Sequence, residues 1–349
     1  MNQLISTIAR LSLVLFPLIS AAEPLIYDGE THLKNVRQLT FGGENAEAYF
    51  SPAGDLIVFQ ATRDSFACDQ IFTMKPDGSA QKLVSTGAGA TTCSFFVPGT
   101  DDIVFCSTHQ HGAECPIKPD RALGYVWGLF DYDVFRSKSD GTNLRVLTNA
   151  KGYDAEAAVS PDGKEVVFTS SRDGDLELYK MNSDGSDVRR LTWTVGYDGG
   201  PFFSPDGKHI VYRCFHPRTT EELSRWNHLW EKQAVSPTRL EIWIMNADGT
   251  GQRQVTNLGG ASFCPYMSPD GRWIIFTSNF ADSSGSRMPN FDLWRIKSDG
   301  SSLERISNSP IFEGFPMWSY DGKRLLFASN RGEQKNPRET NIFIADWVE

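Results

Sequence analysis

The chain has 349 residues, a formal net charge of −9 and 40% hydrophobic residues. This mild excess of acidic groups disfavours nucleic acid and anionic membranes as partners, because both are negatively charged. The length suits one large β domain or two ordinary domains, so composition alone does not decide the architecture.

Residues 1–22 have the pattern of a signal peptide. Arg10 supplies a positive charge, and Leu11–Ile19 is an apolar run shorter than the roughly 20 residues of a membrane-spanning helix. Ser20-Ala21-Ala22 then offers small residues for cleavage. A retained signal anchor is the alternative, which Pro17 within the apolar run disfavours.

We therefore expect an exported protein, periplasmic or secreted, with no membrane span after cleavage. Residues 23–35 are expected to be a short N-terminal extension, and residues 36–349 the folded domain.

One turn sequence recurs six times in the expected domain and reads Ser-Pro-Asp-Gly in its full form. Proline presets φ and glycine takes the positive-φ position of a tight turn. After each turn comes a short apolar run ending in an aromatic residue, as in Val166–Phe168, which suits a strand buried on both faces. The six turns are at 51–54, 97–100, 160–163, 204–207, 268–271 and 319–322.

A second hairpin with an Asp-Gly turn follows in five of the six units. Its outer strand ends in a pair of the Leu-Thr kind, as at Leu191-Thr192. Four antiparallel strands, repeated radially, are a propeller blade. The sixth unit stops at Glu349 without an outer strand, and Val36–Thr40 closely matches Val188–Thr192 of the third unit.

The predicted fold class is therefore all-β, a six-bladed β-propeller of four-stranded antiparallel blades. We expect the N-terminal strand, at about 36–40, to complete the last blade and to cover two sheet edges that otherwise invite aggregation.

The Ser-Pro-Asp-Gly turns and the Met-Asn-x-Asp-Gly turns at Met181–Gly185 and Met245–Gly249 resemble the propeller repeats of the TolB-like family. The resemblance covers residues 36–349 and implies the fold. It does not extend to the separate α/β domain that precedes the propeller in TolB, so it does not imply a role in the Tol–Pal envelope system. The stretch 215–241 resembles an insert of an uncharacterised secreted branch of this family.

Loop lengths indicate which face of the propeller is used. We call the face with the loops between second and third strands, and the loops that lead into each blade, the top face; the Ser-Pro-Asp-Gly turns lie on the bottom face. Bottom turns are short, whereas top loops are enlarged at 106–131, 213–239 and 277–290. Enlarged loops on one face of a rigid scaffold are typical of a binding surface, although such inserts can also simply pack over neighbouring blades.

The blade-four insert predicts a short helix. Thr219-x-x-Glu222 reads as a capping box. Packing of the helix on the top surface is the favoured interpretation, and an exposed apolar face would instead indicate a protein partner or a lid. The apolar face consists of Leu223, Trp226, Leu229 and Trp230.

Six cysteines in an exported chain indicate disulfides: Cys68, Cys93, Cys106, Cys115, Cys214 and Cys264. Blade geometry favours Cys68–Cys93 and Cys214–Cys264 as two staples between adjacent blades, with Cys106–Cys115 closing the blade-two insert. The competing scheme pairs Cys93 with Cys106 and Cys68 with Cys115. A thiol catalyst or a cysteine-rich metal site is disfavoured, since no Cys-x-x-Cys is present.

Histidines in the top loops give an alternative function. His109, His111 and His216 together could bind a divalent metal. Some propeller-fold polysaccharide lyases use metal bound by histidine, so this resemblance implies a metal-dependent lyase or hydrolase. Solvated loop histidines are the favoured interpretation.

Carboxylates are more evenly placed around the predicted channel mouth. Glu47 and Glu156 each lie four residues before a turn serine, and Asp154, Asp198 and Glu313 align two residues earlier. A partial acidic rim of this kind would suit a cation or a basic group. The favoured interpretation is that these acids accept hydrogen bonds from neighbouring backbone N–H groups and tie blades together.

Arginines follow the second strands on the same face, at Arg63, Arg172 and Arg331. A guanidinium fork suits a carboxylate, such as that of a sugar acid or a peptide C-terminus. For Arg63-Asp64 and Arg172-Asp173 the favoured interpretation is instead a local ion pair or a turn brace.

No Ser/His/Asp order, glycine-rich phosphate loop or nucleophile elbow stands out in the sequence, so no catalytic residues and no cofactor are predicted. The predicted function is an exported, non-catalytic binding or scaffold propeller that engages a peptide, protein or glycan on its top face. The binding candidates are Glu47, Arg63, Asp154, Glu156, Arg172, Asp198, His216, Trp226, Trp230, Glu313 and Arg331.

Overall fold

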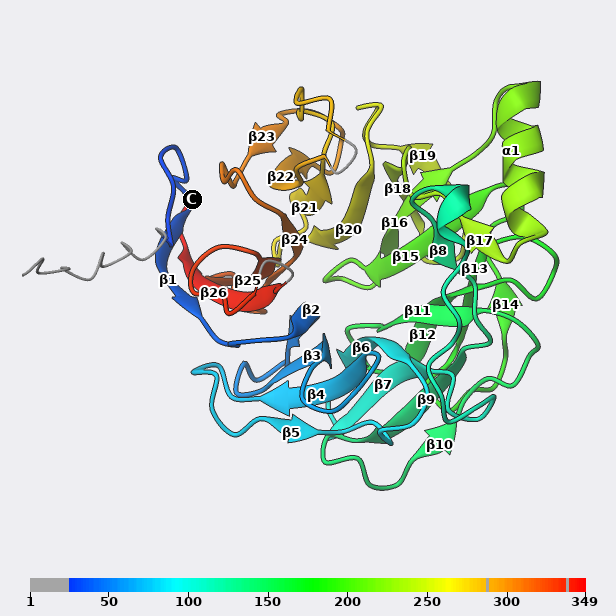
Figure 1. Ribbon diagram of the computed structural model, residues 1–349, viewed down its shortest axis with the longest axis horizontal. Helices are drawn as coiled ribbons and strands as arrows, with labels where there is room; N and C mark the ends of the chain where they lie inside the picture. Colours follow the sequence, from blue (N-terminus) through cyan, green and yellow to red (C-terminus); the bar gives the residue numbers. More distant parts are fainter. Residues whose placement is uncertain (1–24, 287–288, 337–338) are drawn as a thin grey trace, which may run out of the picture.

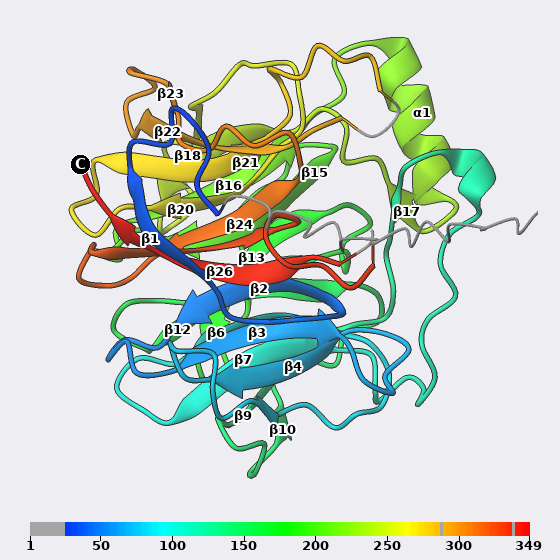
Figure 2. The same ribbon diagram turned by 60° about the vertical axis from the view of Figure 1, so that its left-hand side comes forward.

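A computed structural model describes residues 25–286, 289–336 and 339–349. Six four-stranded antiparallel sheets are arranged radially as blades around a central axis (Figures 1 and 2), which confirms the predicted six-bladed propeller. The strands of each blade are given from the inner strand outward. Blade one comprises β2 (Glu44–Phe50), β3 (Ile57–Thr62), β4 (Gln70–Met74) and β5 (Lys82–Leu83), and blade two comprises β6 (Thr91–Phe96), β7 (Asp102–Ser107), β9 (Asp133–Lys138) and β10 (Arg145–Val146). Blade three comprises β11 (Asp154–Val159), β12 (Glu165–Ser170), β13 (Glu177–Asn182) and β14 (Arg189–Arg190).

Blades four to six repeat this order. Blade four comprises β15 (Tyr197–Phe203), β16 (His209–Phe215), β18 (Glu241–Asn246) and β19 (Arg253–Gln254), and blade five comprises β20 (Ser262–Met267), β21 (Trp273–Ser278), β22 (Asp292–Lys297) and β23 (Glu304–Arg305). Blade six comprises β24 (Glu313–Trp318), β25 (Arg324–Ser329), β26 (Asn341–Trp347) and the N-terminal strand β1 (Leu33–Gln38).

The N-terminal strand closes the ring as predicted. β1 pairs antiparallel with β26, and Figure 2 shows the two strands side by side although they come from opposite ends of the chain. The strand begins at Leu33, earlier than the predicted start at 36, and a bulge between Lys34 and Arg37 interrupts its register.

The Leu-Thr-like pairs close each blade in the same way. After each outer strand, the hydroxyl of the second residue accepts a hydrogen bond of 2.8–2.9 Å from a backbone N–H of the third strand. The bond takes up a backbone donor of the third strand that otherwise lacks a partner where the outer strand ends. The hydroxyls are those of Thr40, Ser85, Thr148, Thr192, Thr256 and Ser307.

The core lies between blades and is built from one repeated aromatic position. The aromatic residue that ends each predicted second-strand run is fully buried, and it pairs in register with an aromatic residue of the third strand. Aromatic cross-strand pairs stabilise sheets beyond the area they bury. The pairs are Phe59–Phe72, Phe105–Phe135, Phe168–Tyr179, Tyr212–Trp243, Phe276–Trp294 and Phe327–Phe343.

The inserts of blades two and four meet over the top of blade three. β8 (Trp127–Gly128) pairs with β17 (Ala234–Val235) in a separate two-stranded sheet, beside the helix α1 (Thr220–Trp230) (Figure 1). The blade-two insert also holds a single 3-10 turn, Arg121–Leu123. Thr219 and Glu222 form the predicted capping box at the start of α1.

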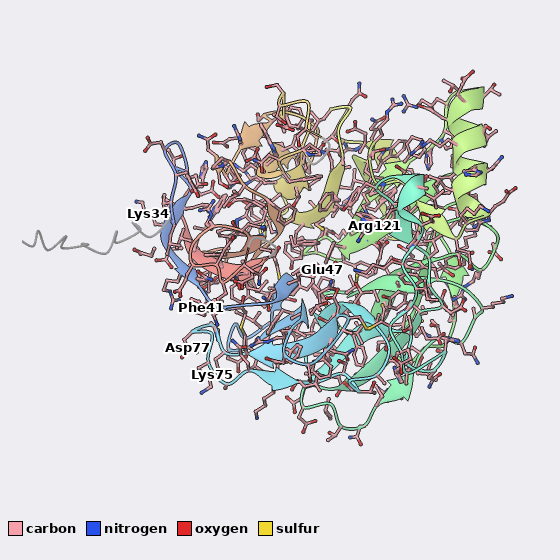
Figure 3. All side chains as sticks on the ribbon, viewed as in Figure 1. Lys34, Phe41, Glu47, Lys75, Asp77 and Arg121 are labelled. Atoms are coloured by element: carbon pink, nitrogen blue, oxygen red, sulfur yellow. A yellow bond between two sulfur atoms is a disulfide. The ribbon has the colours of Figure 1, made fainter. Side chains whose placement is uncertain are left out.

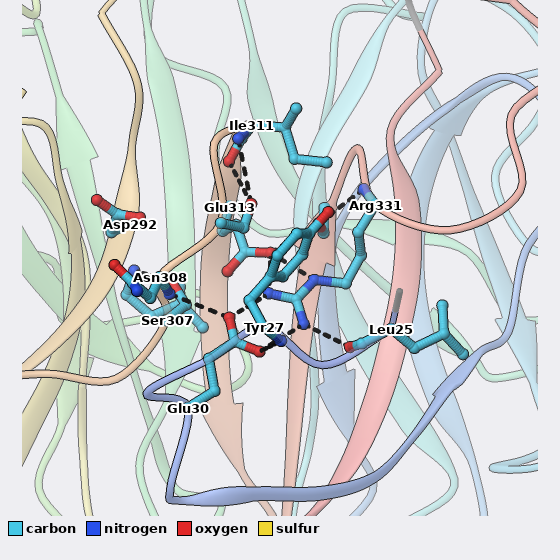
Figure 4. A network of polar contacts seen from close by, with 12 residues as sticks. Leu25, Tyr27, Glu30, Asp292, Ser307, Asn308, Ile311, Glu313 and Arg331 are labelled. Carbon is cyan, nitrogen blue, oxygen red and sulfur yellow. Dashed lines mark hydrogen bonds and ion pairs between the residues drawn. The ribbon is translucent and has the colours of Figure 1, made fainter. Parts of the chain in front are cut away.

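The described part of the N-terminal extension docks on blade six (Figure 4). Glu30 binds Arg331 through two hydrogen bonds, with Oε1 at 2.7 Å and Oε2 at 3.0 Å, and Arg331 also donates to the Leu25 carbonyl at 2.6 Å. The proposed signal peptide at 1–22 lies outside the described residues. Among the residues that are described, no helix has both the length and the apolarity to cross a bilayer.

The cysteine pairing corrects the favoured scheme. Cys68 is bonded to Cys115, as in the competing scheme, so the Cys68–Cys93 and Cys106–Cys115 predictions are wrong. Cys214 and Cys264 are free thiols, so the second staple is wrong as well. Cys93 and Cys106 are also free, so the Cys93–Cys106 pair of the competing scheme is wrong too. The bond ties the 63–69 loop of blade one to the blade-two insert, and such bonds are typical of oxidising compartments.

Candidate functional site at the channel mouth

Each inner strand has one bulge, where it faces the central channel. At every bulge one residue has positive φ, between 49° and 60°. Five of the six are not glycine, a conformation that costs roughly 1 kcal/mol or more per residue and persists only when the surrounding structure imposes it. These residues are Glu47, Cys93, Glu156, Gly200, Cys264 and Phe315, and we call them the bulge ring.

The channel is blocked just below the bulge ring. Two residues further along the inner strands, Tyr49, Phe95, Phe202 and Tyr266 pack ring against ring, with centroids 5.5–6.1 Å apart. Above this aromatic plug, a cavity of about 30 Å³ is lined by members of the bulge ring and by Arg213. A ligand that approaches from the top face therefore stops at the bulge ring.

Glu156 and Arg213 form the charged centre of this mouth. Arg213, on β16 of blade four, donates to Glu156 on β11 of blade three. Tyr197 donates to Glu156 Oε1 at 2.7 Å and accepts from Arg213 Nε at 3.0 Å, so three groups share one buried network. Glu156 Oε2 accepts from Thr169 and from the Gly200 N–H.

Two glycines make room for this network. A Cβ on Gly200 would lie 2.7 Å from Nη1 of Arg213, and one on Gly199 would lie 2.6 Å from Oε2 of Glu156. Blade four has Gly200 where blades one and three have Glu47 and Glu156, because Arg213 occupies the space that a side chain there would fill.

Glu47 lies at the bulge in the middle of β2, near the centre of the ring (Figure 3). Loss of solvation raises the pKa of its carboxyl from 4.5 to about 7, while Cys93 and Arg213 act in the opposite direction. The negative charges of Glu156 and Asp69 add to the increase. Part of its surface stays accessible from the channel.

Trp127 of the blade-two insert covers this mouth. Its ring lies over the Arg213 guanidinium, 5.0 Å from the ring centroid, and meets Tyr197 and Phe263 edge to face. The β8–β17 pairing holds the tryptophan there, so an insert from blade two shields a charge on blade four.

Asp154 and Glu313, two residues before the bulge ring, tie strands within their blades. Asp154 accepts from Arg172 Nη2 at 2.8 Å, and Glu313 accepts from Arg331 Nε at 2.6 Å. Glu313 and Arg331 are fully buried. Burial raises the pKa of Glu313 to about 7, although Arg331 opposes the shift. These residues therefore support the interpretation that the acids brace the blades.

The two predicted Arg-Asp pairs, Arg63-Asp64 and Arg172-Asp173, have different outcomes. Arg63 and Asp64 form the expected local ion pair at 3.4 Å. Arg172 and Asp173 do not pair with each other: Arg172 binds Asp154, and Asp173 accepts hydrogen bonds from Tyr179 and Arg190. The ion-pair half of the prediction for Arg172-Asp173 is therefore wrong, whereas a role in bracing the turn stays a prediction.

The candidate metal-binding histidines do not converge. His109 Nδ1 lies 2.8 Å from the Ser107 hydroxyl, and His111 Nε2 lies 2.7 Å from Asp133. His216 Nε2 lies 3.1 Å from Asp198 Oδ1. Within the described ranges, the one cluster with metal-ligand spacing contains His216 but neither His109 nor His111.

The helix α1 packs its apolar face inward. Trp226 is buried and stacks on Trp230 at 6.1 Å and against Phe215 at 6.4 Å. Leu223, at the other end of the predicted face, is 41% exposed. The two tryptophans thus attach the insert to blade four.

Sequence reasoning missed Arg213, Tyr197 and Trp127. One signal was present: an arginine follows the Ile210–Tyr212 run, at a position where other blades have Gln60, Thr169 or Thr277. The contact with Trp127 had no signal, because it joins loops of different blades.

A further cavity lies on the opposite face. It measures about 490 Å³ and lies between the bottom turns of blades four and five, beside Asp206, Arg253 and Asp270. Asp206 and Asp270 accept hydrogen bonds from the serines of their own turns, so these carboxylates mainly close the turns.

The profile of the TolB beta propeller domain (PD40) matches residues 131–223. An uncharacterized protein of Agrobacterium fabrum, Atu1656, is 31% identical over 133 residues, which are 36% of this chain and 43% of that protein. The chain thus spans less than half the length of this curated relative.

Solved structures share the fold at low identity. A protein described as a candidate TolB from Agrobacterium tumefaciens superposes with a TM-score of 0.58 and 19% identity, over 90% of this chain and 97% of its own. An oligogalacturonate lyase in complex with manganese gives a TM-score of 0.53 and 13% identity, over 90% and 93%. At these identities the likeness extends to the fold alone.

Proposed function

We propose that this six-bladed propeller, which matches the TolB beta propeller domain over residues 131–223, is an exported, non-catalytic binding module whose top face engages a peptide, protein or glycan. The observation that carries the proposal is the joining of two inserts, from blades two and four, into one cover over the top face. Enlarged loops that are fixed to one another form a preorganised surface, which lowers the entropy cost of binding.

The cover and a neighbouring top loop expose large apolar side chains. Ile117 is 93% exposed and Tyr125 is 64% exposed, both in the blade-two insert. Trp193 and Val195, in the top loop that leads into blade four, are 64% and 53% exposed. Exposed aromatic residues on a rigid support are typical of hot spots in protein interfaces, so a peptide or protein is the favoured ligand.

The lyase or hydrolase alternative receives less support. His109 and His111 bind residues of blade two, and the aromatic plug and Trp127 leave only about 30 Å³ at the mouth. A sugar ring does not fit in this volume, because ligand pockets usually measure about 300 Å³ or more.

Two tyrosines on opposite faces provide the test. The protein is screened against peptide and glycan arrays, and the affinity for hits is measured for Tyr125→Ala and for Tyr320→Ala, whose tyrosine is 38% exposed on a bottom turn. We expect Tyr125→Ala to weaken binding by about tenfold or more and Tyr320→Ala to leave it unchanged. Equal effects of the two variants, or turnover of a glycan hit, would contradict the proposal.

A further inference from the structure

One triad of positions recurs on the top side of the blades. Its first member is the inner-strand residue two positions before the bulge-ring residue, and its second is the residue paired with it on the second strand. Its third member lies two positions further along the second strand. In blade three the triad is Asp154–Ser170–Arg172, in which the serine donates to the aspartate and the arginine binds both. Blade six repeats it as Glu313–Ser329–Arg331. An acid, a hydroxyl and a guanidinium thus form a closed ion-pair network.

Blade four departs from this network at two of its three positions. Its triad is Asp198–Cys214–His216, with cysteine in place of serine and histidine in place of arginine. His216 Nε2 lies 3.1 Å from Asp198 Oδ1 and 3.3 Å from Cys214 Sγ. The two changes convert a pair of opposite charges into three groups that each bind transition metals.

We propose that Asp198, Cys214 and His216 bind a divalent transition metal of the zinc class. Zinc takes cysteine sulfur at about 2.3 Å and histidine nitrogen or carboxylate oxygen at about 2.0–2.2 Å, so tetrahedral ligand atoms lie roughly 3.3–3.6 Å apart. The ligand atoms of this triad all lie within 4.8 Å of one another. Binding converts the Cys214 thiol to a thiolate and releases its proton to solvent.

The surroundings fit a metal better than a simple hydrogen-bonded triad. Asp198 is 1% and Cys214 is 3% exposed, so the register of β15 and β16 fixes both ligands. Tyr212, two residues before Cys214 on the same face of β16, is fully buried, and its hydroxyl has no hydrogen-bond partner among the described residues. The rings of Tyr212 and His216 both contact Trp243, so this unpaired polar group lies beside the cluster.

One side of the cluster is open. Cys214 and His216 line a cavity of about 90 Å³, which also holds Arg218 and Arg239. This volume admits water, so the fourth coordination position faces solvent, as in zinc sites with three protein ligands. His216 rests edge to face on Trp243, with ring centroids 5.6 Å apart, which limits rotation of the imidazole.

The test uses Zn²⁺ and Co²⁺ as probes on the full exported chain. We expect one Zn²⁺ per chain by calorimetry, and with Co²⁺ a sulfur-to-cobalt charge-transfer absorption. The double variant Cys214→Ser with His216→Arg rebuilds the blade-three triad, which this fold already accommodates twice, and it should lose both signals. Cys214→Ser alone should lose the cobalt absorption.

Cys264→Ser is the matched thiol control, because Cys264 is also a buried free cysteine, and it should retain both signals. A wild-type protein without the charge-transfer absorption, or a double variant that keeps it, would overturn the proposal. Ligand binding at Tyr125 is measured separately, so failure of the metal site and failure of the proposed function are distinguishable.

Discussion

Arg213 of blade four donates to Glu156 of blade three, and this ion pair joins two neighbouring blades at the centre of the ring. Both side chains are buried, and Trp127 lies over the guanidinium. A buried pair of this kind contributes little net stability by itself, but removing one partner leaves the other charge desolvated and unpaired.

Arg213→Met should therefore lower the free energy of unfolding by about 3–5 kcal/mol. The double variant Arg213→Met with Glu156→Gln removes both charges and should recover part of that loss. Urea denaturation of the single and double variants measures the difference. A double variant less stable than Arg213→Met alone would contradict this account of the pair.

The raised pKa of Glu47, about 7, predicts a pH dependence of stability. The folded state holds this proton more tightly than the unfolded chain does, so its stabilising effect is complete below pH 4.5 and is lost as pH rises to about 7. Glu47→Gln removes the cost of ionisation and should be more stable than wild type at pH 8, by on the order of 1–3 kcal/mol.

Denaturation at pH 5 and at pH 8 measures this effect. Glu44→Gln is the control, because Glu44 lies on the same strand with an exposed side chain, and it should leave the pH dependence unchanged. If the free energy of unfolding of Glu47→Gln differs between pH 5 and pH 8 as much as that of the wild type, another group is responsible for the pH dependence.

The contact between Glu30 and Arg331 should hold the N-terminal segment on blade six. Glu30→Gln leaves Arg331 with one charged partner, Glu313, and should accelerate amide hydrogen exchange in β1 and β26. Asp28→Asn, an exposed acid in the same segment, is the control. Exchange that changes equally in the two variants would argue against a specific role for Glu30.

The Cys68–Cys115 disulfide closes a sequence separation of 47 residues. Cys68→Ser should lower stability by about 2–4 kcal/mol and make it insensitive to reductant, since the cross-link restricts the unfolded chain. Cys264→Ser should retain the response to reductant. Alkylation of the denatured protein should find four thiols, and a second disulfide would contradict this pairing.

Local sequence was sufficient to predict most of the fold. The Ser-Pro-Asp-Gly turns, the buried aromatic residues and the Leu-Thr-like pairs each fix a short hairpin, and their repetition fixes the number of blades. Val36–Thr40 identified the closing strand because it copies Val188–Thr192. The capping box at Thr219 likewise involves only neighbouring residues.

The site depended on contacts between blades, which local patterns do not encode. The alignment of Asp154, Asp198 and Glu313 was visible in the sequence, but not that only Asp198 meets a cysteine and a histidine. The arrangement of Trp127 over Arg213 requires the inserts of two blades to cross a third.

The sequence alone thus determined the ring, because turns and strand periodicity act over a few residues. Only the tertiary structure decided which cysteines are bonded, which charges are buried together and where the top face is covered. Those outcomes depend on distances between residues far apart in the chain, and the ring fixes these distances only once it is closed.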